Sequence, residues 1–339
     1  MRELKITFIG FGNVGREVAR VFVDEKQRLQ DAGLSPRVVA ICTRTRGSII
    51  DEHGIDLKSA LASISRPSVG FPVKGTHALD IIANVETDVV LEMTSLDIFT
   101  GQPAISHAEA ALFSGRHVVL ANKGPVAWAF ARLAKSAEAK GVRLLFEATV
   151  MDGTPVFSLV RHCLRGCRIL GFEGVLNSTS NFVLERMARG GDAEEAVKEA
   201  QAQGFAEADP SLDLEGWDSV AKVAALANVL MSAGTNPTAV SRTGISGLIA
   251  RDFARAARHG NVIKLVCRGS KDAEGAHLSV GPEEVPLAGL LATVTGTSSV
   301  LTLHTDLMGS LSLVEHSPSL TQTAYGVMAD LIEIAREIY

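Results

Sequence analysis

The sequence predicts an α/β fold, with an N-terminal doubly wound Rossmann domain followed by an α+β domain. Through the first half of the 339 residues, apolar runs of strand length alternate with helical segments, and a glycine-rich turn follows the first run. Strands that alternate with helices form a parallel sheet with helices on both faces. The alternation stops near residues 153–155, where we expect the second domain to begin.

Each strand expected in the first domain is a short apolar run. These runs are residues 5–9, 37–42, 88–93, 117–121 and 143–148. Apolar residues at helical spacing predict helices over 16–32, 104–114 and 126–140.

In the second half, residues 170–176, 261–268 and 277–280 have the pattern of strands, whose order in a sheet stays open. The final segment, 323–338, carries an apolar face and is expected to return and cover the first domain. We therefore expect one domain of residues 1–152 joined by about 317–339, and a second of residues 153–316.

The composition excludes several classes of protein. A formal net charge of -5 offers no basic surface for nucleic acid, and 5% aromatic residues leave little for base stacking. The most apolar stretch, residues 220–233, is interrupted by Lys222 and is too short to span a bilayer. The four cysteines form no CxxC pair, as is typical of buried thiols in a reducing cytosol. We expect a cytoplasmic protein that acts on a small molecule, with no nucleic-acid or membrane partner.

The glycine-rich turn predicts a dinucleotide site. A lone GxGxxG is weak evidence, but here a strand precedes it and a helix follows, which is the context of a Rossmann turn. In such a turn the first glycine permits the tight bend, the second admits the pyrophosphate, and the third lets helix and strand pack closely. The alternative is a purely structural glycine turn. The expected cofactor contacts are Gly10, Phe11, Gly12, Asn13, Val14 and Gly15.

The end of the second expected strand favours NADP over NAD. An acidic residue there would bind the ribose 2′-hydroxyl, whereas an arginine suits a 2′-phosphate. The chain has Thr43, Arg44 and Arg46 at this point, and no carboxylate before Asp51. The alternative is that both arginines face solvent and bind no ligand.

Chemistry-bearing residues follow two later strands of the first domain. Lys123 stands just beyond the strand of 117–121, where ligands of parallel sheets bind, and Thr94 follows the strand of 88–93. Both are expected to contact the cofactor, and Lys123 is also a candidate for proton exchange with the substrate.

Two segments of the second half are unusually polar for ordinary turns. Residues 177–181 carry five hydrogen-bonding side chains in a row, and residues 204–218 combine several carboxylates before a helix. Asp218 and Lys222 stand four apart and so share a helical face. An exposed ion pair is the alternative, but the surrounding helix is apolar, and a charged pair on such a helix tends to face a cleft.

These segments resemble the homoserine dehydrogenase family. The resemblance rests on GFGNVG at 10–15, ANK at 121–123 and NSTSNFVLERM at 177–187. The longest match is GFAEADPSLDLEGWDSVAKVAALA at 204–227, and the similarity covers roughly residues 5 to 265. It implies reversible NAD(P)H-dependent reduction of L-aspartate 4-semialdehyde to L-homoserine, in the route to threonine, methionine and isoleucine. It also implies a homodimer formed through the second domain.

The resemblance also implies residue roles. Lys123 and Lys222 match lysines that transfer the proton, and Asp218 matches an aspartate that positions the substrate. The residues matched to substrate contacts are Glu207, Asp213, Ser178 and Thr179. This scheme requires the two ammonium groups to meet in one cleft that faces the nicotinamide ring.

A structural monovalent cation, generally sodium, is implied by the resemblance of residues 147–154. Its ligands would be the Glu147 side chain and the carbonyl groups of Val150, Asp152 and Thr154. Oxygen-only coordination suits a hard cation. The alternative is a turn that only connects the two domains.

Several departures from the family pattern bear on the substrate. Asp152 stands where relatives carry glycine or alanine, Phe205 replaces a tyrosine, and Glu315–Ser319 replace a glycine-rich turn. Two other functions therefore stay open: a related NADP-dependent dehydrogenase acting on another amino-acid-derived aldehyde or alcohol, and a non-catalytic NADP-binding sensor. Because the chain ends at Tyr339, we expect no threonine feedback through the small regulatory domain of longer relatives.

Overall fold

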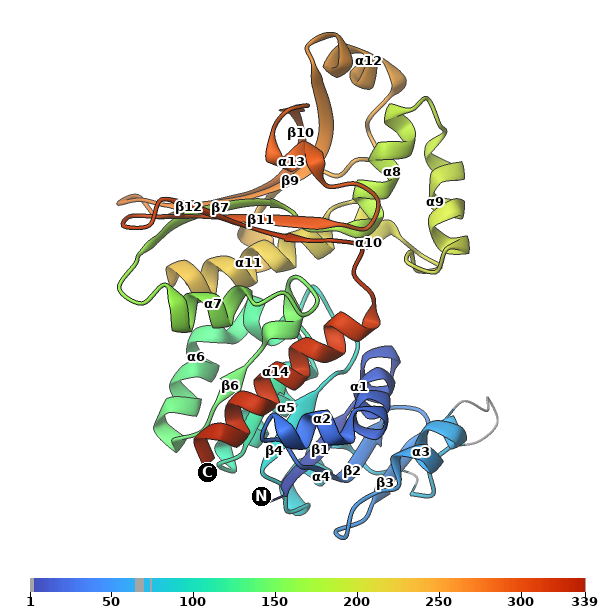
Figure 1. Ribbon diagram of the computed structural model, residues 1–339, viewed down its shortest axis with the longest axis vertical. Coiled ribbons are helices and arrows are strands. Elements are labelled where there is room, and N and C mark those ends of the chain that lie inside the picture. The colour runs from blue at the N-terminus through green and yellow to red at the C-terminus, as the bar shows by residue number, and fades with distance from the viewer. Residues whose placement is uncertain (1–2, 65–69, 74, 339) are drawn as a thin grey trace. The chain divides into compact units, whose positions relative to one another are not determined.

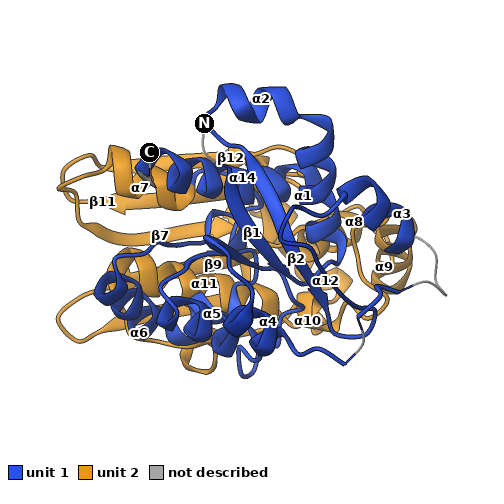
Figure 2. Ribbon diagram, turned by 90° about the horizontal axis from the view of Figure 1, so that it is seen from below, with its two compact units in different colours: residues 1–155, 319–339 blue, residues 156–318 orange. Residues whose placement is uncertain are grey.

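The computed structural model describes residues 3–64, 70–73 and 75–338. The chain forms two compact units, Met1–Pro155 with Ser319–Tyr339, and Val156–Pro318 (Figure 2). In the described residues each unit is built around a six-stranded sheet. Helices pack on both sheets, so the expected mixed α/β class is confirmed.

The sheet of the first unit has the strand order β3-β2-β1-β4-β5-β6 (Figure 1). Its strands are β1 (Leu4–Ile9), β2 (Pro36–Thr43), β3 (Gly47–Ile50), β4 (Val89–Glu92), β5 (His117–Leu120) and β6 (Leu144–Leu145). All neighbours pair in parallel except β2 and β3. The chain order reverses between β1 and β4, and ligands of open α/β sheets bind at the carboxyl ends of strands at such a reversal.

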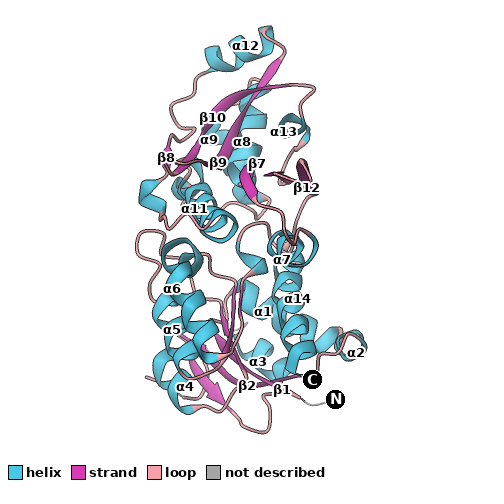
Figure 3. Ribbon diagram, turned by 90° about the vertical axis from the view of Figure 1, so that its left-hand side faces the viewer, coloured by secondary structure: helices cyan, strands magenta, loops and turns pink. Residues whose placement is uncertain are grey.

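Helices cover both faces of this sheet. They are α1 (Asn13–Asp24), α2 (Lys26–Asp31), α3 (Leu57–Ile64), α4 (Ala78–Asn84), α5 (Ala104–Phe113), α6 (Gly124–Lys140), the 3-10 turn η1 (Glu147–Thr149) and α14 (Leu320–Ile338). Figure 3 shows α5 and α6 on one side of the strands and α1 and α14 on the other. The residues Val327, Met328 and Leu331 of α14 are buried, and each contributes about 1.5–3 kcal/mol of hydrophobic stabilisation. The last helix is therefore part of the first unit's core.

Three expectations for the first unit need correction. The helix expected over 16–32 is two helices that meet at Glu25. The strand expected over 143–148 is only two residues long, because the backbone N–H of Glu147 donates to Asp330 of α14 at 2.8 Å and the chain turns into η1. The sheet is not wholly parallel, since β3 folds back against β2.

The second unit has the strand order β12-β11-β7-β9-β10-β8. Its strands are β7 (Ile169–Val175), β8 (Ser241–Arg242), β9 (Asn261–Lys271), β10 (Ala276–Pro286), β11 (Ser299–Thr305) and β12 (Ser310–Glu315). Pairing is antiparallel except between β8 and β10. The three expected strands are confirmed as β7, β9 and β10, whereas β8, β11 and β12 were not predicted.

Helices α7 (Val156–Cys163), α8 (Ser178–Ala188), α9 (Ala193–Ala202), α10 (Ser211–Leu214), α11 (Trp217–Met231), α12 (Ala250–Arg258) and α13 (Leu290–Thr293), with the 3-10 turn η2 (Pro237–Ala239), complete this unit. Helix α11 packs against β7, β9 and β10, with Val220, Val223 and Leu226 fully buried. Among the described residues, every helix is too short or too polar to cross a bilayer.

Candidate active site

The turn after β1 has the geometry that a dinucleotide requires. Gly10 has φ +99°, and a Cβ there would lie 2.5 Å from the Met93 carbonyl oxygen. A Cβ at Gly15 would lie 2.9 Å from the Gly10 carbonyl oxygen, so this glycine permits close packing of helix and strand. Around Gly12, by contrast, the described residues leave open space within 4 Å of a Cβ position. The backbone of the turn is thus tight on its inner side and accessible at Gly12, which fits a pyrophosphate group.

Helix α1 begins directly at this turn, with Gly12 as its N-cap. Glycine has no side chain to cap the first N–H groups, which therefore present a positive dipole end to an anion. Asn13 is exposed and accepts a hydrogen bond from Arg16 at 2.5 Å. Phe11 is buried against Phe8 and Phe71, so its backbone alone faces the turn. Val14 packs at the edge of the same core.

The end of β2 lies beside this turn, because the Gly10 N–H donates to the Cys42 carbonyl at 2.9 Å. Thr43 and Arg46 build the β2–β3 turn: the Thr43 hydroxyl donates to Gly47 O at 2.7 Å and accepts the Arg46 N–H at 2.9 Å. The Arg46 guanidinium donates to Ile64 O at 3.1 Å. Arg44 is exposed at the tip of the turn. Arg44 and Arg46 thus stand in the turn that follows β2, where hydrogen bonds of Thr43 and of the Arg46 backbone hold the turn itself.

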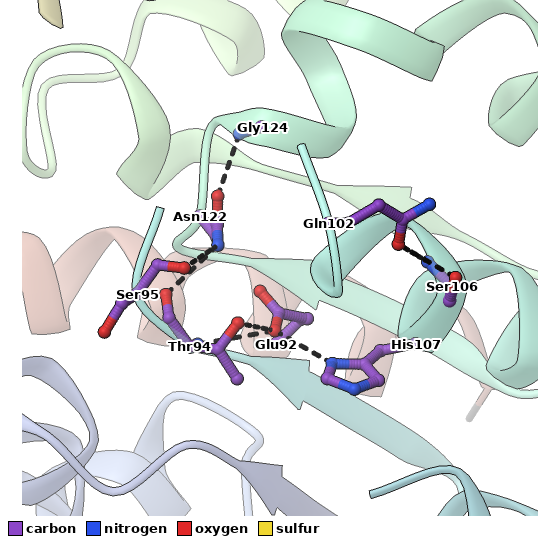
Figure 4. A network of polar contacts seen from close by, with 8 residues as sticks. All are labelled: Glu92, Thr94, Ser95, Gln102, Ser106, His107, Asn122 and Gly124. Atoms are coloured by element: carbon purple, nitrogen blue, oxygen red, sulfur yellow. Dashed lines mark hydrogen bonds and ion pairs between the residues drawn. The ribbon is translucent and has the colours of Figure 1, made fainter. Parts of the chain in front are cut away.

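A polar network joins the ends of β4 and β5 (Figure 4). The Asn122 amide donates to the carbonyl oxygens of Thr94 at 3.1 Å and Ser95 at 3.3 Å. Its own oxygen accepts the Gly124 N–H at 2.9 Å, at the start of α6. Lys123, the N-cap of α6, lies in the sequence between Asn122 and Gly124. One asparagine therefore fixes the backbone of Lys123 relative to that of Thr94.

Glu92, the last residue of β4, extends this network (Figure 4). Its Oε1 accepts hydrogen bonds from the Thr94 hydroxyl and, at 3.4 Å, from the Thr94 N–H. The same oxygen lies 3.3 Å from Nδ1 of the buried His107. Glu92 is fully buried, and its Oε2 has no hydrogen-bond partner among the described residues. Sequence reasoning missed both Glu92 and His107, since a strand-end carboxylate and a helical histidine carry no motif.

In the second unit, four polar side chains converge near the ends of β7 and α11. Lys222 Nζ lies 3.2 Å from Asp218 Oδ2 and donates to the Leu176 carbonyl at 2.6 Å. The Asn177 amide donates to Asp218 Oδ2 at 3.1 Å and to Asp213 Oδ1 at 2.7 Å. The Lys222 and Asp218 side chains are only 16% and 19% exposed, so this is not the solvated surface pair that the sequence left open. Asn177 was not singled out from the sequence, although it opens the polar segment 177–181.

Burial and charge act strongly on this cluster. Desolvation, and then the neighbouring Asp218 carboxylate, raise the pKa of Asp213 above its usual range. Behind the cluster, complete burial raises the pKa of the Cys267 thiol to about 12. Cys267 and Cys42 are buried, as expected from the cysteine pattern, whereas Cys163 is exposed and Cys167 half-buried, so that expectation was wrong for these two.

The remaining expected substrate residues lie at different depths. Residues 177–181 begin helix α8, with Asn177 as N-cap accepting the Ser180 N–H at 2.8 Å. Ser178 donates to Thr297 O at 3.1 Å, and Thr179 is buried at the start of the helix. Glu207 is exposed, and its carbonyl accepts from Gln201 at 3.0 Å. Thr179 belongs to the cluster because its side chain interacts with the Asp213 carboxylate, whereas Glu207 is an exposed residue outside it.

A second buried lysine holds α8 in place. Lys264 donates to Asn181 Oδ1 at 2.7 Å and to Val294 O at 2.6 Å. Its burial lowers its pKa to about 8. Sequence reasoning missed this residue, because a lysine inside an apolar strand run is normally assigned to the surface.

The segment expected to hold a cation, residues 147–154, folds as η1 and the following turn. The Glu147 side chain is buried, and the described residues contain no cluster of three or more His, Cys, Asp or Glu side chains able to bind a metal. Asp152 has φ +46°, its carboxylate accepts the Thr323 hydroxyl at 2.7 Å, and its carbonyl oxygen lies 2.9 Å from the position that a Cβ would take at Gly326. One buried carboxylate with neighbouring carbonyl groups is a donor set that fits a hard monovalent cation.

The expected site residues thus form one group in each unit. Around the carboxyl ends of β1, β2, β4 and β5 lie the glycine turn, Thr43, Thr94 and Lys123. Around Asn177 lie Asp213, Asp218 and Lys222. Lys123 and Lys222 belong to different units, and their meeting over one substrate stays a prediction.

Comparison with known families decides between the functions that the geometry of the site allows. The family described as "Homoserine dehydrogenase, NAD binding domain" matches residues 10–147, and that described as "Homoserine dehydrogenase" matches residues 155–332. The NAD(+)-dependent homoserine dehydrogenase of Pseudomonas canavaninivorans is 36% identical over 340 residues, 98% of this chain and 97% of the relative. The chain belongs to the homoserine dehydrogenase family. It is therefore an NAD(P)-dependent oxidoreductase acting on a CH–OH group, and the open alternatives of another substrate or a non-catalytic sensor are not favoured.

Solved structures of homoserine dehydrogenases agree with this assignment. The enzyme from Thiobacillus denitrificans is 30% identical, with a TM-score of 0.85 over 99% of this chain and 74% of that one. A hyperthermophilic archaeal homoserine dehydrogenase in complex with NADPH is 27% identical, with a TM-score of 0.83 over 99% and 98% of the two chains. Among sequence relatives, the homoserine dehydrogenase of Methanocaldococcus jannaschii is 36% identical over 336 residues, 98% of each chain. These matches support a nicotinamide cofactor for the chain.

Proposed function

We propose that the chain catalyses reversible hydride transfer between NAD(P)H and L-aspartate 4-semialdehyde, which yields L-homoserine. The observation that carries the proposal is the Lys222 ammonium, held by Asp218 and Leu176 O beside the Asn177-bridged carboxylates. A fixed, largely buried cation next to carboxylates suits a substrate that has both a carbonyl and an α-ammonium group.

Lys222 is the proton donor in this scheme. A bound nicotinamide would supply the hydride to the aldehyde carbon, and negative charge would then develop on the carbonyl oxygen. An ammonium in hydrogen-bonding reach stabilises that charge and gives its proton to the oxygen. The contacts at 3.2 Å to Asp218 and 2.6 Å to Leu176 O hold the ammonium in one place, so little reorganisation is needed.

Asp213, Glu207 and the hydroxyls of Ser178 and Thr179 bind the substrate backbone in this proposal. Carboxylates form charge-assisted hydrogen bonds with an α-ammonium group. Asp213 is held for this role by Asn177, and Asp218 positions both Lys222 and the substrate.

Lys123 acts on the same substrate from the first unit and also contacts the nicotinamide end of the cofactor. The Asn122 side chain holds the backbone next to Lys123, which stands at the carboxyl edge of the sheet. Together with Thr94 and the glycine turn, Lys123 makes up the proposed contacts to the cofactor.

NADP is the preferred cofactor in our proposal. Arg44 and Arg46 follow the end of β2, where a 2′-phosphate would lie, and the first carboxylate after β2 is that of Asp51. The archaeal structure with NADPH supports this choice, whereas the Pseudomonas relative is named as NAD(+)-dependent. Preference is therefore a property to be measured for this chain.

We further propose a homodimer formed through the second unit and a cytoplasmic location.

We also propose a sodium ion held by the Glu147 carboxylate and the carbonyls of Val150, Asp152 and Thr154. The ion would brace the segment in which the chain passes from one unit to the other. The buried carboxylate of Glu147 and the neighbouring carbonyl groups support it.

Steady-state reduction of L-aspartate 4-semialdehyde, with NADPH and with NADH, tests the function. We expect turnover with both cofactors and at least about tenfold higher kcat/KM with NADPH, the effect of one or two charge-assisted hydrogen bonds. An Arg44→Ala, Arg46→Ala variant should lose that preference. No turnover with either cofactor would reject the proposed function, and equal kcat/KM values would reject the cofactor preference alone.

A further inference from the structure

We propose that Glu92 is a positioning residue for the nicotinamide cofactor: it fixes the Thr94 hydroxyl as a hydrogen-bond acceptor for an N–H or O–H donor of the bound dinucleotide. This inference rests on the proposed function only in taking the ligand to be NAD(P). Glu92 itself is too deeply buried to reach a ligand, so it acts through Thr94.

The polarity of Thr94 follows from the chemistry of the pair. A threonine hydroxyl has one hydrogen and two lone pairs, and a carboxylate only accepts. The contact between the Thr94 hydroxyl and Glu92 Oε1 therefore uses the single hydrogen of Thr94. What remains on the partly exposed Thr94 is acceptor capacity, so a ligand group that approaches it must donate.

Thr94 lies where such a ligand group would come. Its backbone nitrogen is 2.9 Å from the position that a Cβ would take at Gly10, directly beside the dinucleotide turn. Its carbonyl oxygen accepts from Asn122, which also caps the start of α6 after Lys123. Donors on the nicotinamide half of the cofactor, the carboxamide and the ribose hydroxyls, have the required chemistry.

The cost of burying Glu92 indicates that its position is functional. A carboxylate oxygen without a partner among the described residues carries a desolvation penalty. An apolar residue at the end of β4 would avoid that penalty. It would also release the Thr94 hydroxyl to rotate, and leave His107 without its 3.3 Å partner.

A double-mutant cycle on cofactor binding tests the inference. NADPH or NADH, whichever binds wild type more tightly, is titrated against Glu92→Met, Thr94→Val, the double variant and Glu92→Gln. Each of the first two is expected to raise the cofactor Kd about five- to tenfold, the effect of one hydrogen bond. The double variant should be within about twofold of Thr94→Val, because Glu92 acts only through that residue. Glu92→Gln keeps the oxygen that Thr94 uses and should stay within about twofold of wild type.

The control is Glu86→Gln, since Glu86 is 84% exposed and pairs with Lys5 at 2.6 Å. If Glu92→Met does not fold, Glu92→Asp replaces it, because shortening the side chain by one methylene withdraws the acceptor while keeping the charge. Multiplying effects in the double variant would overturn the inference, as would a Glu92→Gln variant as impaired as Glu92→Met. Because no substrate is added, an enzyme that binds the cofactor but does not reduce aspartate semialdehyde would reject the proposed function and leave this inference standing.

Discussion

At the scale of single residues, the candidate site combines groups that folding alone would not favour. Asn177 brings Asp213 and Asp218 onto one amide, and burial, followed by the repulsion between the two carboxylates, raises the pKa of Asp213. An acid whose pKa is raised on folding makes the native state less stable once the pH exceeds its unfolded value, because ionisation is then costlier in the folded chain. The cost is present at neutral pH and falls away as the pH drops.

Asp213→Asn should therefore stabilise the fold and impair the enzyme. The amide can still accept from Asn177, so at pH 7.5 we expect a higher Tm than wild type. Loss of the charge should raise the KM for aspartate semialdehyde about 10- to 100-fold, the value of one charge-assisted hydrogen bond. Differential scanning calorimetry and steady-state kinetics measure the two effects. Asp209→Asn, an exposed carboxylate bonded to Ser211 at 3.1 Å, is the matched control, and an unchanged KM in Asp213→Asn would exclude substrate binding by this residue.

At the scale of elements, the strand–turn–helix at the N-terminus was predictable because its requirements are local. Gly10 approaches the residues that follow the adjacent strand, Gly15 approaches Gly10 five residues away, and Gly12 leaves open space among the described residues. Strands β11 and β12 were missed because polar residues interrupt their apolar pattern: Thr302 and Ser312 face each other across this hairpin at 2.8 Å. A strand whose pattern is interrupted in this way carries a weak local signal.

At the scale of elements, the structure also shows the backbone conformation and packing of residues that depart from the expected family pattern. Asp152 and Ser317, which lie in segments expected to depart from the family pattern, both adopt positive φ, at +46° and +44°. Short polar side chains tolerate this region better than bulky ones. Phe205 packs edge-on against Phe182, with ring centroids 4.9 Å apart, so its ring serves the core.

Alanine at two positions of the glycine turn should separate folding from binding. Gly10→Ala must place a methyl group 2.5 Å from the Met93 carbonyl oxygen at φ +99°, so we expect a loss of at least about 2 kcal/mol in the free energy of unfolding. Gly12→Ala meets open space and should cost no more than about 1 kcal/mol. Its methyl group lies where pyrophosphate approaches, so its cofactor Kd should rise at least about tenfold. Urea unfolding and cofactor titration decide, and a Gly12→Ala variant with wild-type affinity would contradict this placement of the pyrophosphate.

At the scale of the whole molecule, the sequence predicted the functional groups better than their environment. Lys222, Asp218 and the glycine turn belong to contiguous motifs and could be named in advance. Asn177 as a bridge, Glu92 as a buried acceptor and Lys264 as a clamp depend on side chains that folding brings together from distant segments. The two units divide the work in our proposal, the first binding the cofactor and the second the substrate.

The central claim is that Lys222 gives the proton to the substrate oxygen, and the kcat of Lys222→Met tests it most directly. Lys271→Met is the matched control. Like Lys222, Lys271 lies in the second unit and donates to a backbone carbonyl, in its case Met231 O of α11 at 2.8 Å. We expect kcat for aspartate semialdehyde reduction to fall about 10²- to 10⁴-fold in Lys222→Met, the range for loss of a general acid. Lys271→Met should stay within about threefold of wild type. A Lys222→Met enzyme that folds and keeps a kcat close to that of the control would contradict the claim.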